Sequence, residues 1–222
     1  MDFTVGQKNR IFRDLIVIIG GSDGTLQRRK EFTVYNPCSK QWQICDSLSM
    51  SQPVSHHAVV ELNKDIYVIE AKHETGEWTT VGSMYDKRSK LCAVVFNGQI
   101  YVMGGANREG ALSSAEKYDP KTNQWTFLAS MAKSRANAAA VACNGKIYVT
   151  GGVNSMMKVM DSVEVLDENS NEGVHRWITL YNTMTVPRQG HSIVCWNNDM
   201  LIAGGRNNRS ISLDSVEILV KT

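Results

Sequence analysis

Apolar and polar positions alternate in short runs along the chain, and the pattern is clearest in residues 91–131. LCAVVF and QIYVMGG (91–105) are two apolar runs separated by Asn97-Gly98, which is typical of two strands joined by a tight hairpin turn. SSAEKYDP (113–120) and QWTFLASM (124–131) follow as two further strand-like runs. Because four short strands follow one another and no segment has helical periodicity, the pattern predicts one blade of a β-propeller.

This blade pattern recurs, which predicts an array of similar blades. One marker is a glycine pair at the end of the second strand: Gly20-Gly21, Gly104-Gly105, Gly151-Gly152 and Gly204-Gly205. Another is a tryptophan in the fourth strand: Trp42, Trp78, Trp125 and Trp177. We expect the tryptophans to pack between blades, and the glycines to be needed where a strand end meets a neighbouring backbone.

The second repeat is shortened. Tyr67 and Tyr101 are 34 residues apart, whereas Tyr101 and Tyr148 are 47 apart, and Glu70-Ala71 stands in place of a glycine pair. The thirteen absent residues correspond to the glycine-pair loop and the third strand. We therefore expect a three-stranded blade in which residues 72–76 turn the second strand directly into the fourth. The alternative is that the deletion disorders this blade.

The repeated combination of IYVMGG, AEKYDP and QWTFLASM resembles the kelch motif over residues 15–219, and its details are similar to the kelch domains of BTB-Kelch (Kelch-like) adaptor proteins. The resemblance implies an all-β kelch β-propeller formed by a single domain, residues 1–222. We recognise five repeats, at approximately 1–50, 51–84, 85–131, 132–184 and 185–222. The second lacks its third strand, and the terminal repeats are incomplete. Residues 2–12 could supply a strand to the ring, and no BTB- or BACK-like segment precedes the repeats.

Two polar positions recur in register on loops, which carry the functional variation on such scaffolds. In three repeats an arginine lies nine residues before the hairpin turn: Arg88, Arg135 and Arg188. The second residue after each glycine pair is Asp or Asn: Asp23, Asn107, Asn154 and Asn207. We expect both sets near one mouth of the central channel, where guanidinium groups would bind a carboxylate or phosphate in a bidentate manner.

Each recurring residue also has a structural alternative. The Asp and Asn side chains can cap their own turns by accepting backbone N–H bonds, and the arginines can pack or pair locally. Arg206 and Asn207, in the run GGRNN, match a stretch that contributes to acidic-peptide binding in some BTB-Kelch relatives. His191 lies near the same loops, with packing or hydrogen bonding at a strand start as its alternative role.

Charge and cysteine content narrow the class of protein. The net charge of +2 is too small to indicate binding to nucleic acid or to a membrane surface. The five cysteines are scattered without a CxxC pair, so we expect reduced thiols in a cytoplasmic protein. Because the chain has no HExxH motif and no convergent His/Tyr/Cys set on the mouth loops, we expect no catalytic residue, metal site or cofactor.

These observations favour a non-catalytic module that binds a protein or an acidic peptide segment at the loop face of the propeller. The resemblance implies substrate recognition for a cullin-3 ubiquitin ligase adaptor, or a competitor that lacks the BTB half. The alternative is a kelch protein that binds actin or another cytoskeletal protein.

Overall fold

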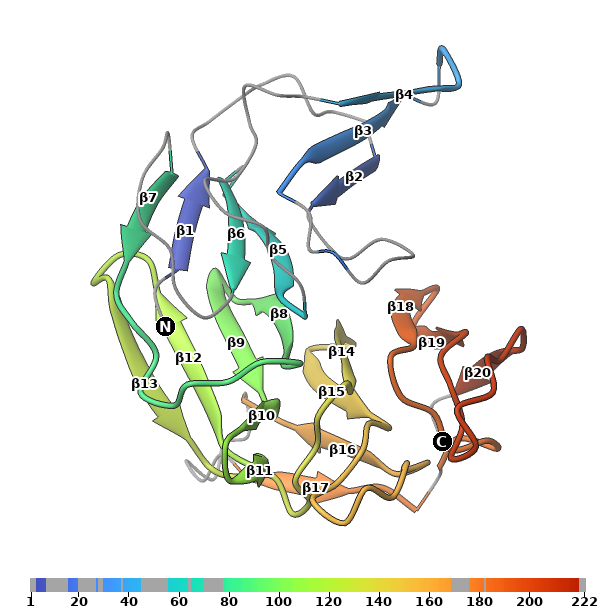
Figure 1. Ribbon diagram of the computed structural model, residues 1–222. Helices are drawn as coiled ribbons and strands as arrows, with labels where there is room; N and C mark the ends of the chain where they lie inside the picture. The colour runs from blue at the N-terminus through green and yellow to red at the C-terminus, as the bar shows by residue number, and fades with distance from the viewer. Residues whose placement is uncertain are drawn as a thin grey trace. The chain divides into compact units, whose positions relative to one another are not determined.

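The computed structural model describes residues 3–6, 16–19, 27, 30–36, 38–44, 56–63, 65–69, 78–168, 176–181 and 183–219. The chain divides into two compact units, Met1–Met84 and Tyr85–Thr222. All regular elements in these ranges are β-strands, and they form small antiparallel sheets (Figure 1). The all-β architecture follows from the period-2 apolar runs, which cannot bury one face as helices.

The unit Tyr85–Thr222 contains three consecutive blades, which we number by repeat as blades 3, 4 and 5. Blade 3 consists of β8 (Cys92–Phe96), β9 (Gln99–Met103), β12 (Ala115–Asp119) and β13 (Gln124–Leu128). Blade 4 consists of β14 (Ala139–Cys143), β15 (Lys146–Thr150), β16 (Val163–Leu166) and β17 (Trp177–Thr179). Blade 5 has three strands, β18 (Ser192–Trp196), β19 (Asp199–Ala203) and β20 (Val216–Leu219). The four-strand pattern predicted for residues 91–131 is therefore confirmed in blade 3, and it recurs in blade 4.

A short hairpin of β10 (Ala106–Asn107) and β11 (Gly110–Ala111) lies in the glycine-pair loop of blade 3. Asn97 and Gly98, which join β8 to β9, both have positive φ angles, of 49° and 73°. The predicted Asn-Gly hairpin turn is thus present, with the left-handed conformation that these residues tolerate.

The unit Met1–Met84 contains two blades. Blade 1 has three strands, β2 (Ile16–Ile19), β3 (Phe32–Asn36) and β4 (Gln41–Ile44). Blade 2 has the strand order β5-β6-β1-β7. These strands are β1 (Phe3–Gly6), β5 (Ala58–Leu62), β6 (Asp65–Ile69) and β7 (Trp78–Val81). The N-terminal strand therefore lies between two strands of the second repeat (Figure 1).

This strand order corrects one expectation. The second repeat does lack its own third strand, but blade 2 is not three-stranded, because β1 pairs antiparallel with both β6 and β7. The second strand of the repeat consequently does not pair with the fourth. Residues 72–76, expected to turn one directly into the other, lie outside the described residues. The expectation that residues 2–12 supply a strand is met by Phe3–Gly6.

The core of the larger unit lies between blades 3 and 4. It contains Met103 of β9, Ile147 and Val149 of β15, and Trp177 of β17, all with 8% or less of their surface exposed. The Trp177 indole N–H donates to the carbonyl oxygen of Ala129 at 2.9 Å, which joins the fourth strand of blade 4 to the end of blade 3. The expected inter-blade packing of the tryptophans is therefore present at Trp177.

Trp125, in the fourth strand of blade 3, is also buried, and its ring stacks on Tyr118 of the adjacent strand with centroids 5.1 Å apart. Trp42 differs, because 54% of its surface is exposed. Burial of the recurring tryptophan thus holds in blades 3 and 4 and fails in blade 1.

The glycine pairs of blades 3 and 4 lie where a strand end meets the next blade. Gly104 has a φ angle of +60°, and a Cβ atom placed on it would lie 2.3 Å from the carbonyl oxygen of Arg135. Gly151 repeats this geometry, with a Cβ position 2.4 Å from the carbonyl oxygen of Arg188. Glycine is needed at these sites for both its left-handed conformation and its lack of a side chain.

The substitution Gly104→Ala is expected to destabilise the domain more than Gly98→Ala. Both alanines would adopt a positive φ angle, at a cost of about 1–2 kcal/mol, but a Cβ at Gly98 meets no atom within 4 Å. At Gly104 the clash with the backbone adds a further ~1–3 kcal/mol. Urea unfolding of both variants measures the difference, and equal losses of stability would show that the close approach to Arg135 is unimportant.

Candidate functional site

The three recurring arginines lie in loops that precede the first strands of blades 3, 4 and 5. Arg88 precedes β8, Arg135 precedes β14 and Arg188 precedes β18. All three residues have no exposed surface. The arginines therefore point into the blades and not into solvent, and their contacts identify their role.

Arg135 is saturated with hydrogen bonds inside blade 4. Its Nη1 donates to the carbonyl oxygens of Gly151 (2.7 Å) and Ser162 (3.0 Å). Its Nη2 donates to Glu164 Oε1 at 2.9 Å and to Ser162 Oγ, and its Nε donates to the same glutamate oxygen at 3.1 Å. Glu164 lies on β16 and is also fully buried, so the two opposite charges neutralise each other inside the blade.

The same ion pair occurs in the neighbouring blades, and we call it the Arg–Glu clamp. Arg88 pairs with Glu116 of β12 at 2.8 Å, and Arg188 pairs with Glu217 of β20. In each blade the glutamate also accepts two backbone N–H groups of the loop that carries the arginine. The clamp therefore fixes the entry loop to the third strand of its own blade.

The backbone of Arg135 also joins blade 4 to blade 3. Its N–H donates to the carbonyl oxygen of Leu112, and its carbonyl accepts the N–H of Gly105 at 2.7 Å. Arg188 makes the equivalent bonds to Met160 and Gly152. This corrects the expectation that Arg88, Arg135 and Arg188 present their guanidinium groups to a ligand. All three hold their own blades together, and the backbones of Arg135 and Arg188 also align consecutive blades.

The recurring asparagines cap their own turns. Asn107 Oδ1 accepts the N–H of Glu109 at 2.8 Å, and Asn154 Oδ1 accepts the N–H of Lys158 at 2.9 Å. Asn207 Oδ1 likewise accepts the N–H groups of Arg209 and Ile211. These side chains shape the loops, as the structural alternative proposed. Asp23, the fourth member of the set, lies outside the described residues.

His191 is enclosed at the start of β18, with 7% of its surface exposed. Its Nε2 lies 2.8 Å from Thr150 Oγ1, and its ring packs against the position where Gly151 would carry a Cβ. Burial, together with the nearby charge of Arg188, lowers the pKa of His191 to about 4. The imidazole is therefore neutral at pH 7 and packs between blades, which corrects its expected place at a partner-binding surface.

What remains exposed above the clamps is a surface that we call the loop face. It consists of the loops 85–91, 104–114, 132–138, 151–162, 185–191 and 204–215. Hydrogen bonds make it continuous, because Ser155 Oγ donates to Ala111 O at 3.2 Å and Val159 N–H donates to Asn208 Oδ1 at 2.8 Å. The first bond joins blades 3 and 4, and the second joins blades 4 and 5.

The inner part of the loop face is a chain of three residues that sequence reasoning missed. Asn137 N–H donates to Lys90 O, and Gly190 N–H donates to Asn137 O. All three have positive φ angles, between 53° and 61°. Each lies two residues after a clamp arginine, so the repeat register contained the signal. Because the three residue types differ, this inner chain carries the ammonium group of Lys90, the side-chain amide of Asn137 and, at Gly190, no side chain.

The outer part of the loop face is basic. Its exposed cationic residues are Lys87, Arg108, Lys133, Lys158, Arg206 and Arg209. Its exposed acidic residues are Glu109 and Asp214. Met156 and Met157 lie at the tip of the blade 4 loop with 83% and 80% of their surfaces exposed. Of the residues expected to bind a partner, Arg206, Asn107, Asn154 and Asn207 lie on this face.

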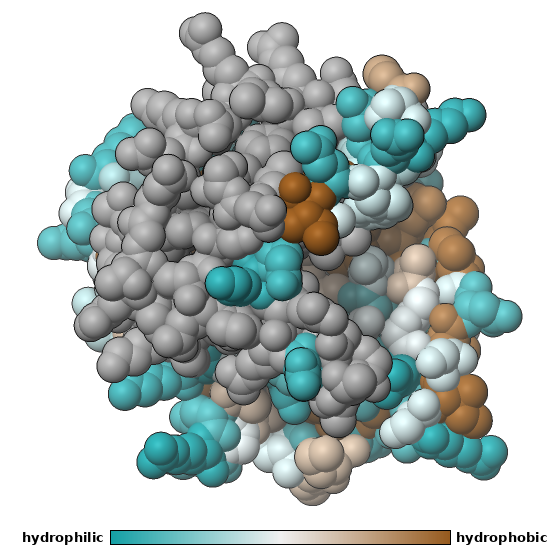
Figure 2. Space-filling view, turned by 45° about the horizontal axis from the view of Figure 1, so that its top comes forward, coloured by the Kyte–Doolittle hydropathy of each residue, from teal (hydrophilic) through white to brown (hydrophobic). Residues whose placement is uncertain are grey.

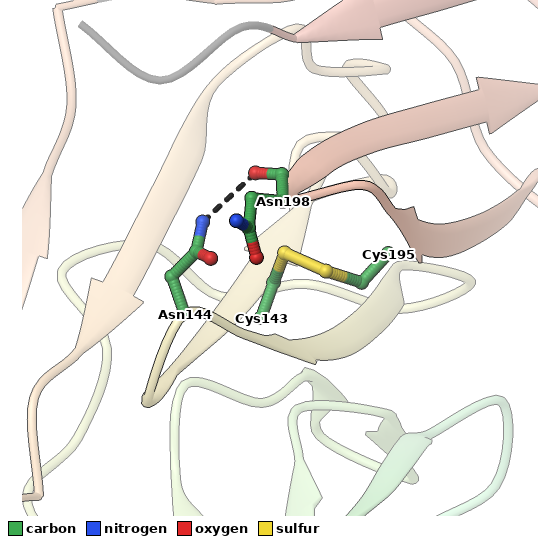
Figure 3. The surroundings of a disulfide bond; sticks show 4 residues. All are labelled: Cys143, Asn144, Cys195 and Asn198. Atoms are coloured by element: carbon green, nitrogen blue, oxygen red, sulfur yellow. Dashed lines mark hydrogen bonds between the residues drawn. A yellow bond between two sulfur atoms is a disulfide. The ribbon is translucent and has the colours of Figure 1, made fainter.

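A disulfide joins the other ends of the inner strands. Cys143, the last residue of β14, is bonded to Cys195 of β18, with their Cα atoms 5.6 Å apart (Figure 3). Beside it Asn144 Nδ2 donates to Asn198 O at 2.8 Å, again between blades 4 and 5. The expectation of reduced thiols is therefore wrong for these two cysteines. Cys92 is free and buried, and burial raises the pKa of its thiol to about 12.

The described part of the chain contains neither a group of potential metal ligands nor a membrane-spanning helix. No three His, Cys, Asp or Glu side chains gather there in a way that could hold a metal ion. No helix among the same residues is long and apolar enough to cross a membrane.

Breaking one clamp is expected to cost more than breaking a surface ion pair. Glu164→Gln leaves Arg135 as a buried charge with a weaker partner, and we expect a loss of ~3–5 kcal/mol in the free energy of unfolding. The control Asp167→Asn breaks the pair that Lys146, 40% exposed at its side chain, makes with Asp167 at 2.8 Å, and should cost less than ~1 kcal/mol. Urea titrations followed by tryptophan fluorescence compare them, and similar losses would contradict the structural role of the clamp.

Reduction of Cys143–Cys195 is expected to lower the melting temperature. The bond closes a loop between residues 52 apart in sequence, and its loss should cost about 2–4 kcal/mol. Melting with and without dithiothreitol measures the shift, and Cys143→Ser should melt at one temperature in both buffers. An unchanged melting temperature after thiol titration has confirmed reduction would show that the disulfide contributes nothing.

Comparison with known proteins agrees with this geometry. Alpha-scruin of Limulus polyphemus is 26% identical over 92% of this chain and 25% of its own length. Kelch-like protein 35 of Mus musculus is 32% identical over 50% of this chain and 22% of its own length. Spermatocyte protein spe-26 of Caenorhabditis elegans is 29% identical over 48% and 22%, respectively. The chain thus spans a quarter or less of the length of these relatives.

The fold also matches a solved structure, described as the structure of YjhT. It has a TM-score of 0.73 and 12% sequence identity, and it covers 93% of this chain and 78% of the other. The family described as the KLHDC2/KLHL20/DRC7 Kelch-repeats domain matches residues 61–205, which include β6 and β7 of blade 2, the described parts of blades 3 and 4, and β18 and β19 of blade 5. The repeats, the β-propeller fold and this match agree: the chain belongs to the Kelch-repeat domain family.

Proposed function

We propose that the loop face of Tyr85–Thr222 binds an acidic segment of a partner protein, and that the domain acts without catalysis. The observation that carries this proposal is the charge on the loop face, where six exposed lysines and arginines face solvent with two exposed acidic residues. Clustered cations of this kind attract an acidic segment over a distance and speed its association.

The construction of the loops supports the proposal. The clamps and asparagine caps hold the backbone of each loop, so exposed side chains start from fixed positions and lose little further backbone freedom on binding. Met156 and Met157 add flexible apolar contact area beside the cations, a combination that suits an extended peptide with acidic and apolar residues. Hydrophobic side chains also reach the surface elsewhere in the described structure, among hydrophilic ones (Figure 2).

The wider role follows the family. We propose that the bound segment belongs to a substrate, and that the domain recognises it for a cullin-3 ubiquitin ligase adaptor. A chain without the ligase-recruiting half would instead compete for the same substrate. A cytoplasmic location is part of this proposal. In that reducing compartment the Cys143–Cys195 disulfide would be open to reduction.

The substitution Arg206→Glu/Arg209→Glu is expected to weaken binding of a fluorescein-labelled peptide made of repeated Asp-Glu-Met-Tyr by about tenfold or more, because it replaces attraction with repulsion. The control Lys121→Glu/Arg176→Glu makes the same change in charge at exposed residues next to the opposite ends of β12 and β17. Fluorescence anisotropy at several salt concentrations measures the affinities. Equal weakening in both variants would reduce the effect to net charge and contradict a site on the loop face.

The same variants distinguish a substrate adaptor from a cytoskeletal protein. In capture from cell lysate, a substrate adaptor should lose its acidic partner with Arg206→Glu/Arg209→Glu and retain it with the control. Co-sedimentation with actin filaments that is unaffected by either variant would overturn the proposal in favour of a cytoskeletal function.

A further inference from the structure

Blade 2 contains a binding slot for a strand that its own repeat does not supply. β1 occupies this slot, with Val5 opposite Tyr67 of β6 on one side and opposite Thr79 of β7 on the other. In the strand order β5-β6-β1-β7, β1 lies between β6 and β7, so among the described strands the pairing of these two into one sheet depends on β1.

The register of β1 matches that of a genuine third strand. In blade 3, Lys117 lies opposite Tyr101 on one side and Thr126 on the other, and Tyr101 and Thr126 correspond in the repeat to Tyr67 and Thr79. Val5 therefore takes the place of Lys117. The slot imposes the register found in blade 3, although its strand comes from the other end of the unit.

The sequence of β1 is also that of a third strand. Residues 2–5 read Asp-Phe-Thr-Val, and residues 31–34 read Glu-Phe-Thr-Val. The second segment forms most of β3, which lies between β2 and the tryptophan-bearing strand β4 of blade 1, as β12 lies between β9 and β13 in blade 3. β1 and β3 lie in the same register to their tryptophan-bearing strands: Tyr35 lies opposite Trp42, and Gly6 lies opposite Trp78. Two independent observations, pairing and sequence, thus place β1 in this role.

The strand in the slot lacks the clamp that fixes the third strands of blades 3 to 5. Glu116 of β12 occupies the rung opposite Val102, and the equivalent rung opposite Val68 is occupied by Thr4. The position of the clamp arginine is Val54 in the second repeat. β1 is therefore held without a buried ion pair, and it is a terminal strand of four residues.

We propose that this slot is a strand-exchange site, in which β1 of a second copy of the chain replaces the molecule's own β1. Because donor and acceptor are present in every copy, the exchange is reciprocal and closes a two-fold dimer. The same backbone bonds form in the monomer and the dimer, so protein concentration sets the balance between them. This interaction is independent of the loop face.

Cysteine pairs placed on opposite rungs test the proposal. Val5→Cys and Thr79→Cys in one chain should form a disulfide on oxidation, as should the matched control Lys117→Cys/Thr126→Cys in blade 3. If the control forms and the Val5/Thr79 pair does not, β1 does not occupy the slot and the proposal is overturned.

Exchange is then tested with two full-length chains that carry Val5→Cys and Thr79→Cys separately, with different tags. After mixing, oxidation should give a disulfide-linked heterodimer whose yield rises with protein concentration. A mixture with Thr80→Cys in place of Thr79→Cys should lose the product, because neighbouring strand residues point to opposite faces. Disulfides within the double variant alone, with no heterodimer in the mixture, would overturn exchange while leaving β1 in its own blade.

Discussion

The structure of each complete clamp depends on one constraint: an arginine with no exposed surface must have an opposite charge and enough acceptors beside it. A buried unpaired guanidinium would cost several kcal/mol, so the third strand has to supply a glutamate and the strand ends have to supply carbonyl oxygens. Arg135 receives both, from Glu164 and from Gly151 and Ser162. This requirement sets the approach of the entry loop and the position of the glycine pair. The buried charge of the clamp arginine thus determines the conformation of a loop that reaches solvent.

The clamp also determines where binding chemistry is located. The side chains of Arg88, Arg135 and Arg188 form contacts inside the blades, so none of the three guanidinium groups remains to contact a partner. The positions outside the clamps differ from blade to blade: Lys90, Asn137 and Gly190 occupy equivalent places on the inner chain. A partner protein does not have the symmetry of the propeller, so positions that vary between repeats suit its recognition better than positions that recur.

This distinction explains what the sequence could and could not predict. Strand order within blades 3 and 4 followed from period-2 runs and an Asn-Gly turn, which are local signals. Recurrence was correctly used to find the repeats, but recurrence of Arg88, Arg135 and Arg188 indicates a structural role, since each blade has the same internal need. The exposed cations of the loop face differ in position from repeat to repeat, so periodicity did not identify them. The disulfide joins Cys143 to a cysteine 52 residues away, and only the packing of two blades brings them together.

Blade 2 shows what the same constraint implies where both clamp residues are absent. Its repeat has lost the third strand, and with it the site of the glutamate, while the arginine position holds Val54. Loss of one member alone would leave a buried charge without a partner, so the two changes are physically coupled. With both absent, no buried arginine in the slot requires a glutamate on the strand. The slot can therefore accept Thr4 at the position that Glu116 occupies in blade 3. A clamp arginine and glutamate would have bound the second repeat to its own third strand. The absence of both allows β1, from elsewhere in the chain, to take the place of that strand.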